Sequence, residues 1–179
     1  MNRKRFTERL QPSLLDRLTD HNPSRRSESE KERFFNVTDL KKSVIRDIEW
    51  LLNCSNGLDI DDLSEHALVR YSVAQYGIRG LSGSTVSNIS TDSFRQELIK
   101  TITYFEPRIL SETLEVEVTA TADGMNKKAL SLLVAGKVWG DPVPVQLYMR
   151  TDIDLETGSV NLVDTSDPFK NLSSSEKVS

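Results

Sequence analysis

The 179-residue sequence has one cysteine, two histidines and no run of about 18 apolar residues of the kind that spans a membrane. Cys54 alone cannot form an intramolecular disulfide, and His21 and His66 do not stand in a spacing typical of a zinc site. No apolar segment follows the basic start MNRKRFTERL, so neither export nor membrane insertion is expected. These absences favour a reducing, cytoplasmic setting without a metal or other cofactor.

Acidic residues outnumber basic ones, with 27 aspartates and glutamates against 23 lysines and arginines. The formal net charge is -4 at pH 7, which argues against a nucleic-acid backbone or an anionic membrane surface as the main partner. Hydrophobic residues make up 37% of the sequence, which is enough to form the core of one domain. At 179 residues, the sequence is too short for two domains to be expected.

Composition divides the chain into three parts. Residues 1-37 combine a short helix after Pro12 with a charged, serine-rich linker, and the helix would bury Leu14, Leu15 and Leu18 against a neighbour. Residues 38-165 are predicted to form a single α+β domain. Residues 166-179 have the composition of a disordered tail.

Three helices are expected in the first half of the domain. The first is capped by Thr38 or Asp39 and carries an apolar stripe from Leu40 to Leu52, a second covers about 64-75, and a third covers about 92-105. Pro107 forbids regular continuation of the third helix. The aromatic residues on or beside these stripes are predicted to pack in the core: Trp50, Tyr71, Tyr76, Tyr104 and Phe105.

From residue 113 the apolar period changes from about 3.6 to 2, which is typical of half-buried strands. Strands are predicted at about 114-120, 130-138 and 145-150, with a short last strand at Val160 and Leu162. Pro142 and Pro144 mark a strand start or a sheet edge. The predicted fold class is α+β, with N-terminal helices packed on one face of a largely antiparallel or mixed β-sheet.

Glu106-Pro107-Arg108 is the stretch that raises the question of chemistry. A glycoside hydrolase needs two carboxylates, and Glu106 could be the acid with Asp123, Asp141 or Asp152 as its partner. Arg108 argues against this role, because two residues along an extended chain it projects to the same side and favours the ionised carboxylate.

Two other interpretations of this stretch remain open. The two charges can pair with each other at the surface after proline has ended the helix, a contact worth roughly 0-1 kcal/mol. Alternatively, the carboxylate and the forked guanidinium can be presented together to a partner protein. The sequence has no catalytic triad spacing and no phosphate-binding loop that would favour a different chemistry.

Several stretches in this order resemble one family: LQPSLLDRLTD (10-20), VIRDIEWLLN (44-53), SVAQYGI (72-78), TITYFEPRI (101-109) and LETGSV (155-160). The combination is similar to the TssE subunits of the bacterial type VI secretion baseplate, which are relatives of the phage baseplate wedge proteins sometimes labelled lysozyme-like. The SLLDRL segment resembles TssE more than the shorter phage proteins. One departure is Ile78-Arg79, where the family often has a Pro-Asp pair.

The resemblance implies a cytoplasmic, non-enzymatic wedge component that joins the TssF and TssG subunits and offers a platform for the TssB/TssC contractile sheath. It also implies that the Glu106-Pro107-Arg108 motif helps to hold the wedge together, with Glu106 and Arg108 as the residues carried over from the family. A docked N-terminal helix with Leu14, Leu15 and Leu18 as its buried face fits a subunit that reaches toward a neighbour. The alternatives are a peptidoglycan-cleaving muramidase, suggested by the lysozyme-like label, and a wedge protein of a contractile phage tail.

Overall fold

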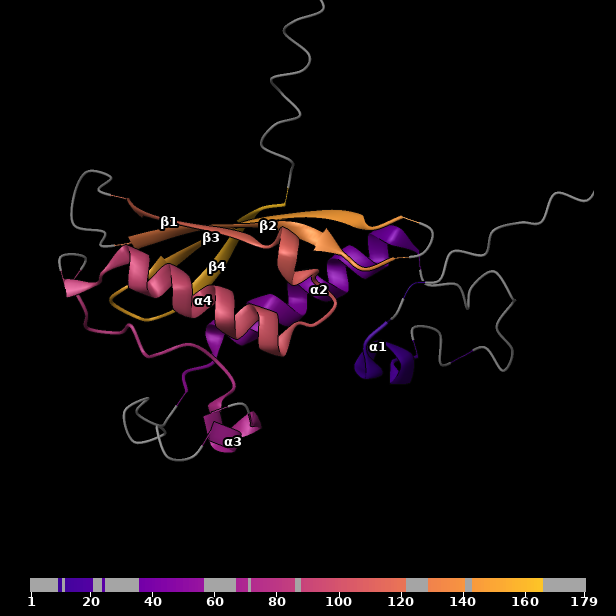
Figure 1. The fold of residues 1–179 in the computed structure, drawn as a ribbon, viewed down its shortest axis with the longest axis horizontal. Helices are drawn as coiled ribbons and strands as arrows, with labels where there is room; N and C mark the ends of the chain where they lie inside the picture. Colours follow the sequence, from indigo (N-terminus) through magenta and orange to yellow (C-terminus); the bar gives the residue numbers. More distant parts are fainter. Residues whose placement is uncertain are drawn as a thin grey trace, which may run out of the picture.

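The computed structural model describes residues 10, 12-20, 24, 36-56, 67-70, 72-85, 88-121, 129-140 and 143-165. Most of the predicted linker and the whole predicted tail therefore lie outside the described residues. The first half of the chain supplies helices α1 (Leu14–Leu18), α2 (Val37–Asn53), α3 (Ala67–Arg70) and α4 (Thr91–Phe105), and the 3-10 turns η2 (Val73–Gln75) and η4 (Ser111–Thr113) (Figure 1).

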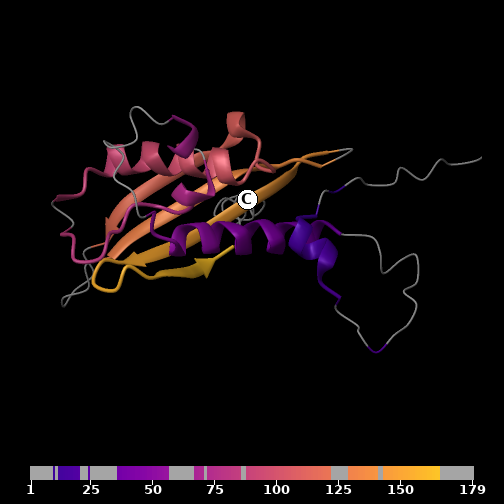
Figure 2. The same cartoon turned by 90° about the horizontal axis from the view of Figure 1, so that it is seen from below.

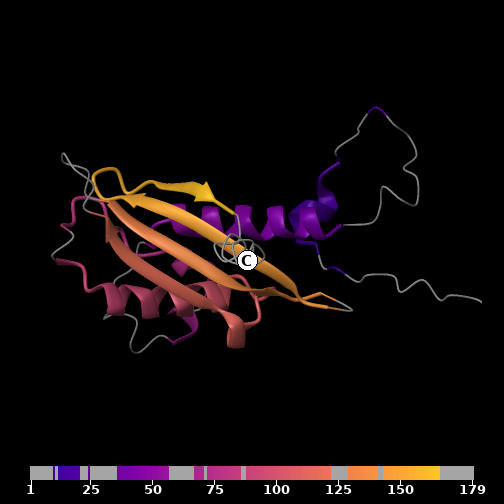
Figure 3. The ribbon, with the colours of Figure 1, turned by 90° about the horizontal axis from the view of Figure 1, so that it is seen from above.

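The second half supplies four strands: β1 (Glu115–Thr121), β2 (Ala129–Val138), β3 (Val145–Asp154) and β4 (Val160–Asp164). They pair in sequence order, and all three pairings are antiparallel. Helices α2 and α4 lie on the same face of the sheet, whereas the other face, seen in Figure 3, carries no helix among the described residues. The predicted α+β class is confirmed, and the sheet is antiparallel rather than mixed.

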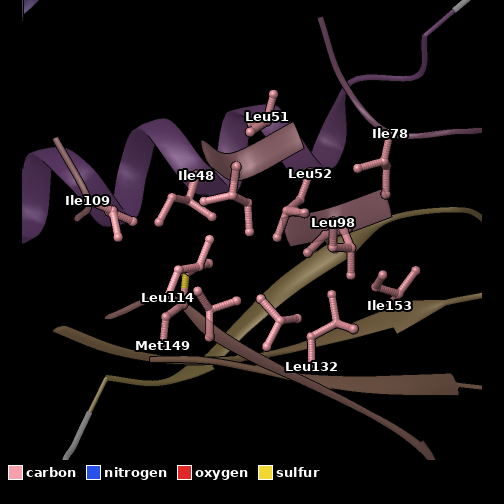
Figure 4. Close-up of a cluster of buried hydrophobic side chains, with 14 of the residues drawn as sticks. Ile48, Leu51, Leu52, Ile78, Leu98, Ile109, Leu114, Leu132, Met149 and Ile153 are labelled. Carbon is pink, nitrogen blue, oxygen red and sulfur yellow. The ribbon is translucent and has the colours of Figure 1, made fainter. Parts of the chain in front are cut away.

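The core lies between the two long helices and the inward face of the sheet (Figure 4). The two central strands, β2 and β3, bury every second side chain. Helix α2 contributes five fully buried apolar side chains at helical spacing, and α4 contributes three: Leu40, Val44, Ile48, Leu51, Leu52, Phe94, Leu98 and Ile102. Burial of this apolar surface supplies the main driving force for the fold.

Helix α2 is capped earlier in the chain than predicted. Asn36 is its N-cap, has extended backbone angles, and accepts a hydrogen bond from the Asp39 backbone N–H at 2.9 Å. Neither Thr38 nor Asp39 is the cap, because both already lie within the first turn. Asparagine is as good a cap as either predicted residue, so the apolar stripe located the helix but not its first residue.

The single helix predicted over 64-75 is wrong. Among the described residues of this region, 67-70 form α3 and 73-75 form η2. Ser72 lies between them, and its hydroxyl donates to the Val69 carbonyl at 2.8 Å and accepts from the Ala74 N–H at 3.2 Å. These local bonds compete with helical ones. Leu68 and Val73 are 89% and 88% exposed, so no buried face stabilises a longer helix.

Two aromatic residues do not pack in the core as predicted. Trp50 is 49% exposed and lies under the Arg46 guanidinium, whose central carbon is 5.0 Å from the ring centroid, and Tyr104 is 47% exposed. Both lie off the buried stripe of their helix. Tyr76 and Phe105 do pack against the core and meet edge to face, whereas Tyr71 lies outside the described residues.

Pro144 marks a strand start and not a sheet edge. It stands directly before β3, and β3 is hydrogen bonded to β2 on one side and to β4 on the other. A proline is tolerated there because the ladder begins only at the next residue. The two edge strands are β1 and β4, so Pro144 does not identify a free edge, and Pro142 lies outside the described residues.

Gly77 holds the end of α2 against the loop that follows η2. Its φ of +119° is a conformation that residues with a side chain rarely adopt, and a Cβ atom added there would lie 2.2 Å from the Cys54 carbonyl oxygen. The next residue, Ile78, donates its N–H to that same oxygen at 2.9 Å. Glycine is therefore required where the two segments approach.

Candidate functional site

The Glu106-Pro107-Arg108 stretch forms a corner at the C-terminal end of α4. Glu106 is the C-cap residue, and its N–H still bonds the Ile102 carbonyl at 2.8 Å. The chain then turns so that the Ile109 N–H bonds the Glu106 carbonyl at 3.1 Å, and the Arg108 carbonyl accepts from the Trp139 N–H at 2.7 Å. The corner is thereby attached to the end of β2, with the exposed Pro107 at its tip.

The two charged side chains of the corner face each other. The Arg108 Nε donates to Glu106 Oε1 at 2.6 Å, and a terminal nitrogen of the same guanidinium donates to Oε2. This is a bidentate ion pair, the strongest hydrogen-bonding geometry available to these groups. Of the interpretations left open by the sequence, pairing of the two charges is the one that the structure contains, but not at the surface, because Glu106 is only 3% exposed.

Arg108 also reaches across to α2. Its guanidinium donates to the Ser43 hydroxyl oxygen at 2.9 Å and to the Asp47 carboxylate. Burial alone would lower the pKa of Arg108, but hydrogen bonds and charge attraction from Glu106 and Asp47 outweigh it, so the pKa is raised above its ordinary value. Arg108 is therefore a permanent cation that joins the end of α4 to the middle of α2.

A second arginine extends the network toward the N-terminus. Arg46 donates to Asp47 Oδ1 at 2.7 Å and to Asp16 Oδ1 of α1 at 2.7 Å. The result is an alternating series, Asp16–Arg46–Asp47–Arg108–Glu106, which we call the acid–base chain. Every acid in it contacts at least one base, and three carboxylates with two guanidiniums leave the series with one net negative charge.

Helix α1 is attached to α2 through its polar side. Ser13 and Asp16 form a capping box, and Asp16 Oδ2 also accepts from the buried Ser43 hydroxyl. Burial alone would raise the pKa of Asp16, but hydrogen bonds from Arg46, Ser13 and Ser43 and the charge of Arg46 outweigh it and lower the pKa well below its usual range. Figure 2 shows α1 beside the N-terminal end of α2.

The leucines of α1 do not bury themselves within the chain. Leu14, Leu15 and Leu18 are 69%, 45% and 74% exposed. The structure thus places the two predicted contact regions at opposite ends of one network. At the corner, the charged groups are paired within the chain. At α1, the leucine side chains are exposed to solvent.

A pocket of about 400 Å³ lies between the corner and the segment that leads into α1. Its walls combine the charged groups with aromatic and apolar surface from α2, η2 and α4: Pro12, Ser13, Asp47, Leu51, Tyr76, Phe105, Glu106, Pro107 and Arg108. Burial raises the pKa of Tyr76, and the nearby negative charges of Asp47 and Glu106 contribute to the rise.

This geometry is unsuited to glycoside cleavage. Both oxygens of the Glu106 carboxylate accept hydrogen bonds from Arg108, and the group is buried, so neither oxygen is placed to contact a substrate. Asp152 alternates with the inward-facing Thr151 and Ile153 and so lies on the other face of the sheet. Asp123 and Asp141 lie outside the described residues.

The part of the chain that the structure describes contains no group of three histidine, cysteine, aspartate or glutamate side chains placed to hold a metal ion. Among the described helices, none combines the length and apolar character needed to cross a bilayer.

Sequence reasoning identified the corner but missed the residues that hold it: Ser13, Asp16, Ser43, Arg46 and Asp47. A signal was present in α2, where Ser43 and Asp47 stand four residues apart, directly beside the apolar positions 44 and 48. Polar residues at the border of a buried stripe face whatever packs alongside it. The spacing indicates a polar contact, although it does not identify the contacting segment.

The fold is α+β, with helices followed by an antiparallel sheet, and the charged corner joins α4 to α2. A family model described as baseplate wedge protein gp25 matches residues 38–143, more than half of the chain. The chain belongs to this family of baseplate wedge proteins, which is also the family of TssE. Searches of the curated proteins and of the solved structures gave no significant match.

Membership of this family supports a structural role in a phage-like baseplate and interaction with other baseplate components. The matched region contains α2, α4, β1, β2 and the corner. Helix α1 precedes it.

Proposed function

We propose that the chain is a structural subunit of a type VI secretion baseplate in the bacterial cytoplasm, where it joins the wedge subunits TssF and TssG and starts assembly of the TssB/TssC sheath. The observation that carries this proposal is the baseplate wedge family match over residues 38–143. The leucine-rich segment in front of it, SLLDRL, favours a secretion baseplate over a phage tail.

The exposed leucines of α1 are the proposed contact with the other wedge subunits. Three large aliphatic side chains on a five-residue helix present apolar surface that the chain itself leaves uncovered. Clustered exposed apolar side chains mark interaction sites more often than isolated ones do. A partner that covers them gains the burial energy that the isolated chain does not use.

The corner is proposed to contribute indirectly. Because Glu106 and Arg108 are satisfied by each other and by Asp47, they fix the position of the exposed Pro107 and of the pocket walls. Holding a contact surface rigid in its bound form reduces the entropy lost on binding. This role differs from direct presentation of the two charges to a partner.

The sheath is proposed to begin on an edge of the sheet. Within the described residues, β1 and β4 are each hydrogen bonded on one side only, so each has backbone groups free to accept an added strand. Strand addition of this kind uses main-chain hydrogen bonds and tolerates differences in side chains.

The test is a triple substitution of Leu14, Leu15 and Leu18 to serine, with binding to co-expressed TssF and TssG measured by co-purification and titration. We expect unchanged folding, because the leucines are exposed, and a loss of affinity of about tenfold or more. The matched control places serine at three other strongly exposed aliphatic positions: Leu68, Val73 and Val143.

Undiminished binding by the leucine triple variant would refute the proposed contact. Turnover of peptidoglycan by the purified protein over a pH series would favour the muramidase alternative instead. Neighbouring genes that encode a contractile phage tail, rather than a secretion cluster, would assign the chain to the tail baseplate.

A further inference from the structure

We infer that the acid–base chain is a latch that couples the docking of α1 to the arrangement of the Glu106–Arg108 corner. When α1 leaves α2, the corner loosens, and when the corner is disturbed, α1 is released. The coupling is a property of the isolated chain. Its importance for assembly rests on the proposed function, because it makes the two proposed contact regions change together.

The first step is that α1 is held weakly and almost wholly by polar contacts. Five residues are too few for a helix that is stable alone, and none of them is buried. The hydrogen bonds to the domain converge on Asp16, which accepts from Ser43 and Arg46. Loss of this one carboxylate therefore removes most of what holds α1 in place.

The second step is that two groups of α2 are shared between α1 and the corner. The Ser43 hydroxyl has a single proton, which it donates to Asp16, and its oxygen accepts from Arg108 at 2.9 Å. The Asp47 carboxylate accepts from Arg46 through Oδ1 and from Arg108 through Oδ2. Asp16 and Arg108 thus interact without touching.

The third step is the response at each end. Without Asp16, the Ser43 proton loses its acceptor and one nitrogen of Arg46 loses its partner, so both groups reorient beside Asp47 and Arg108. Without Arg108, Asp47 Oδ2 becomes free to draw Arg46 away from Asp16. Coupling between two sites is reciprocal in free energy, so both responses have the same origin.

The position of the pocket gives the latch a mechanical consequence. Leu10 packs against the core, and the segment between it and Asp16 contributes Pro12 and Ser13 to the pocket wall at the corner. When Asp16 loses its hydrogen bonds to Ser43 and Arg46, α1 moves together with Pro12 and Ser13, while Leu10 stays packed against the core. A partner that draws α1 away from α2 would therefore also move Pro12 and Ser13 out of the pocket wall.

The test measures amide hydrogen exchange in α1 of the full chain, without any partner. The informative amides are those of Arg17 and Thr19, which bond the carbonyls of Ser13 and Leu15 at 3.1 and 2.9 Å. We expect Asp16→Asn to lower their protection about tenfold and Arg108→Gln to lower it about threefold. Arg108 contacts neither amide, so its effect has to pass through the network.

The matched control is Arg79→Gln, which breaks the ion pair with Glu97 in α4 and should leave α1 protection unchanged. In the double variant Asp16→Asn/Arg108→Gln, the α1 amides should be no less protected than in Asp16→Asn alone. Both substitutions release the same contact between α1 and α2, so the second has nothing further to release. Unchanged protection in Arg108→Gln, or effects that multiply in the double variant, would overturn the coupling.

Global destabilisation is distinguished within the same experiment. Exchange of the buried amides of α4 reports general unfolding, and only loss of protection in α1 beyond that of α4 counts. If Arg108→Gln unfolds the domain, Glu106→Gln decides the question, because it disturbs the corner through Arg108 and removes none of the hydrogen bonds that reach Asp16. The exchange experiment contains no wedge subunit, so a negative result in it does not bear on the proposed function. A negative result in the wedge-binding experiment likewise does not bear on the coupling.

Discussion

Arg108→Met tests how much the fold depends on a compensated charge at the corner. The substitution keeps an unbranched side chain about as long as the aliphatic part of arginine and removes the guanidinium. Glu106, 3% exposed, then retains no cation, whereas Asp47 keeps Arg46. Removing one partner of a buried ion pair typically costs about 3–5 kcal/mol, because the remaining charge is stranded in a poorly solvated site.

That cost is a large part of the stability of a domain of this size, which is of the order of 5–15 kcal/mol. Unfolding in urea, followed by circular dichroism, should show a lower midpoint with an unchanged slope. The thermal midpoint should fall by about 10 °C. The control is Arg79→Met, whose ion pair with Glu97 is longer, at 3.4 Å, and more exposed, so we expect a loss of about 1 kcal/mol or less.

The decisive variant combines Arg108→Met with Glu106→Met. If the loss comes from a stranded carboxylate, removing that carboxylate as well should restore at least half of the stability, since an ion pair replaced by apolar groups of similar volume is often nearly neutral. A double variant as unstable as Arg108→Met alone would refute this reasoning and assign the loss to packing at the corner.

Two further predictions concern other parts of the fold. Gly77→Ala should lower the free energy of unfolding by more than about 2 kcal/mol in urea titrations, because its Cβ would meet the Cys54 carbonyl, whereas Gly83→Ala, with a positive φ but nothing within 4 Å, should cost about 1 kcal/mol. Folding lowers the pKa of Asp16 below its ordinary value, so the ionised carboxylate stabilises the fold above that value and the contribution is lost as the pH falls. Asp16→Asn should therefore be less stable than the wild type by about 1–2 kcal/mol near neutral pH, with a difference that shrinks below about pH 4; an unchanged gap there would contradict the ion-pair assignment.

The elements that bury a repeated apolar face could be predicted from sequence. Helices α2 and α4 and the four strands appear where the periods of 3.6 and 2 place them, because the period decides which side chains reach the core. The region of α3 and η2 has apolar residues without a face to bury, as the exposure of Leu68 and Val73 shows. There, the hydrogen bonds of the Ser72 side chain determine the backbone conformation. The spacing of apolar residues in the sequence gives no sign of such bonds.

The corner could be predicted only in its local part. Two residues apart and separated by proline, Glu106 and Arg108 can pair whatever the rest of the chain does. The contact between Arg108 and Asp47 joins residues 61 positions apart and exists only because α2 and α4 pack side by side on the sheet. Burial of Glu106 follows from the same packing, so a pairing expected at the surface became an internal one.

The edge strand β1 also bears on which neighbours the chain can accept. Glu115, Glu117 and Thr119 project from the same face of β1 and are exposed. If two copies of the chain paired edge to edge through β1 in antiparallel fashion, glutamates of both copies would gather on one face, and like charges across a strand pair are destabilising. Within the described residues β1 is paired on one side only, and charge repulsion opposes pairing of its other side with a second copy. We therefore expect an incoming strand with lysine or arginine on that face to be preferred over a second copy.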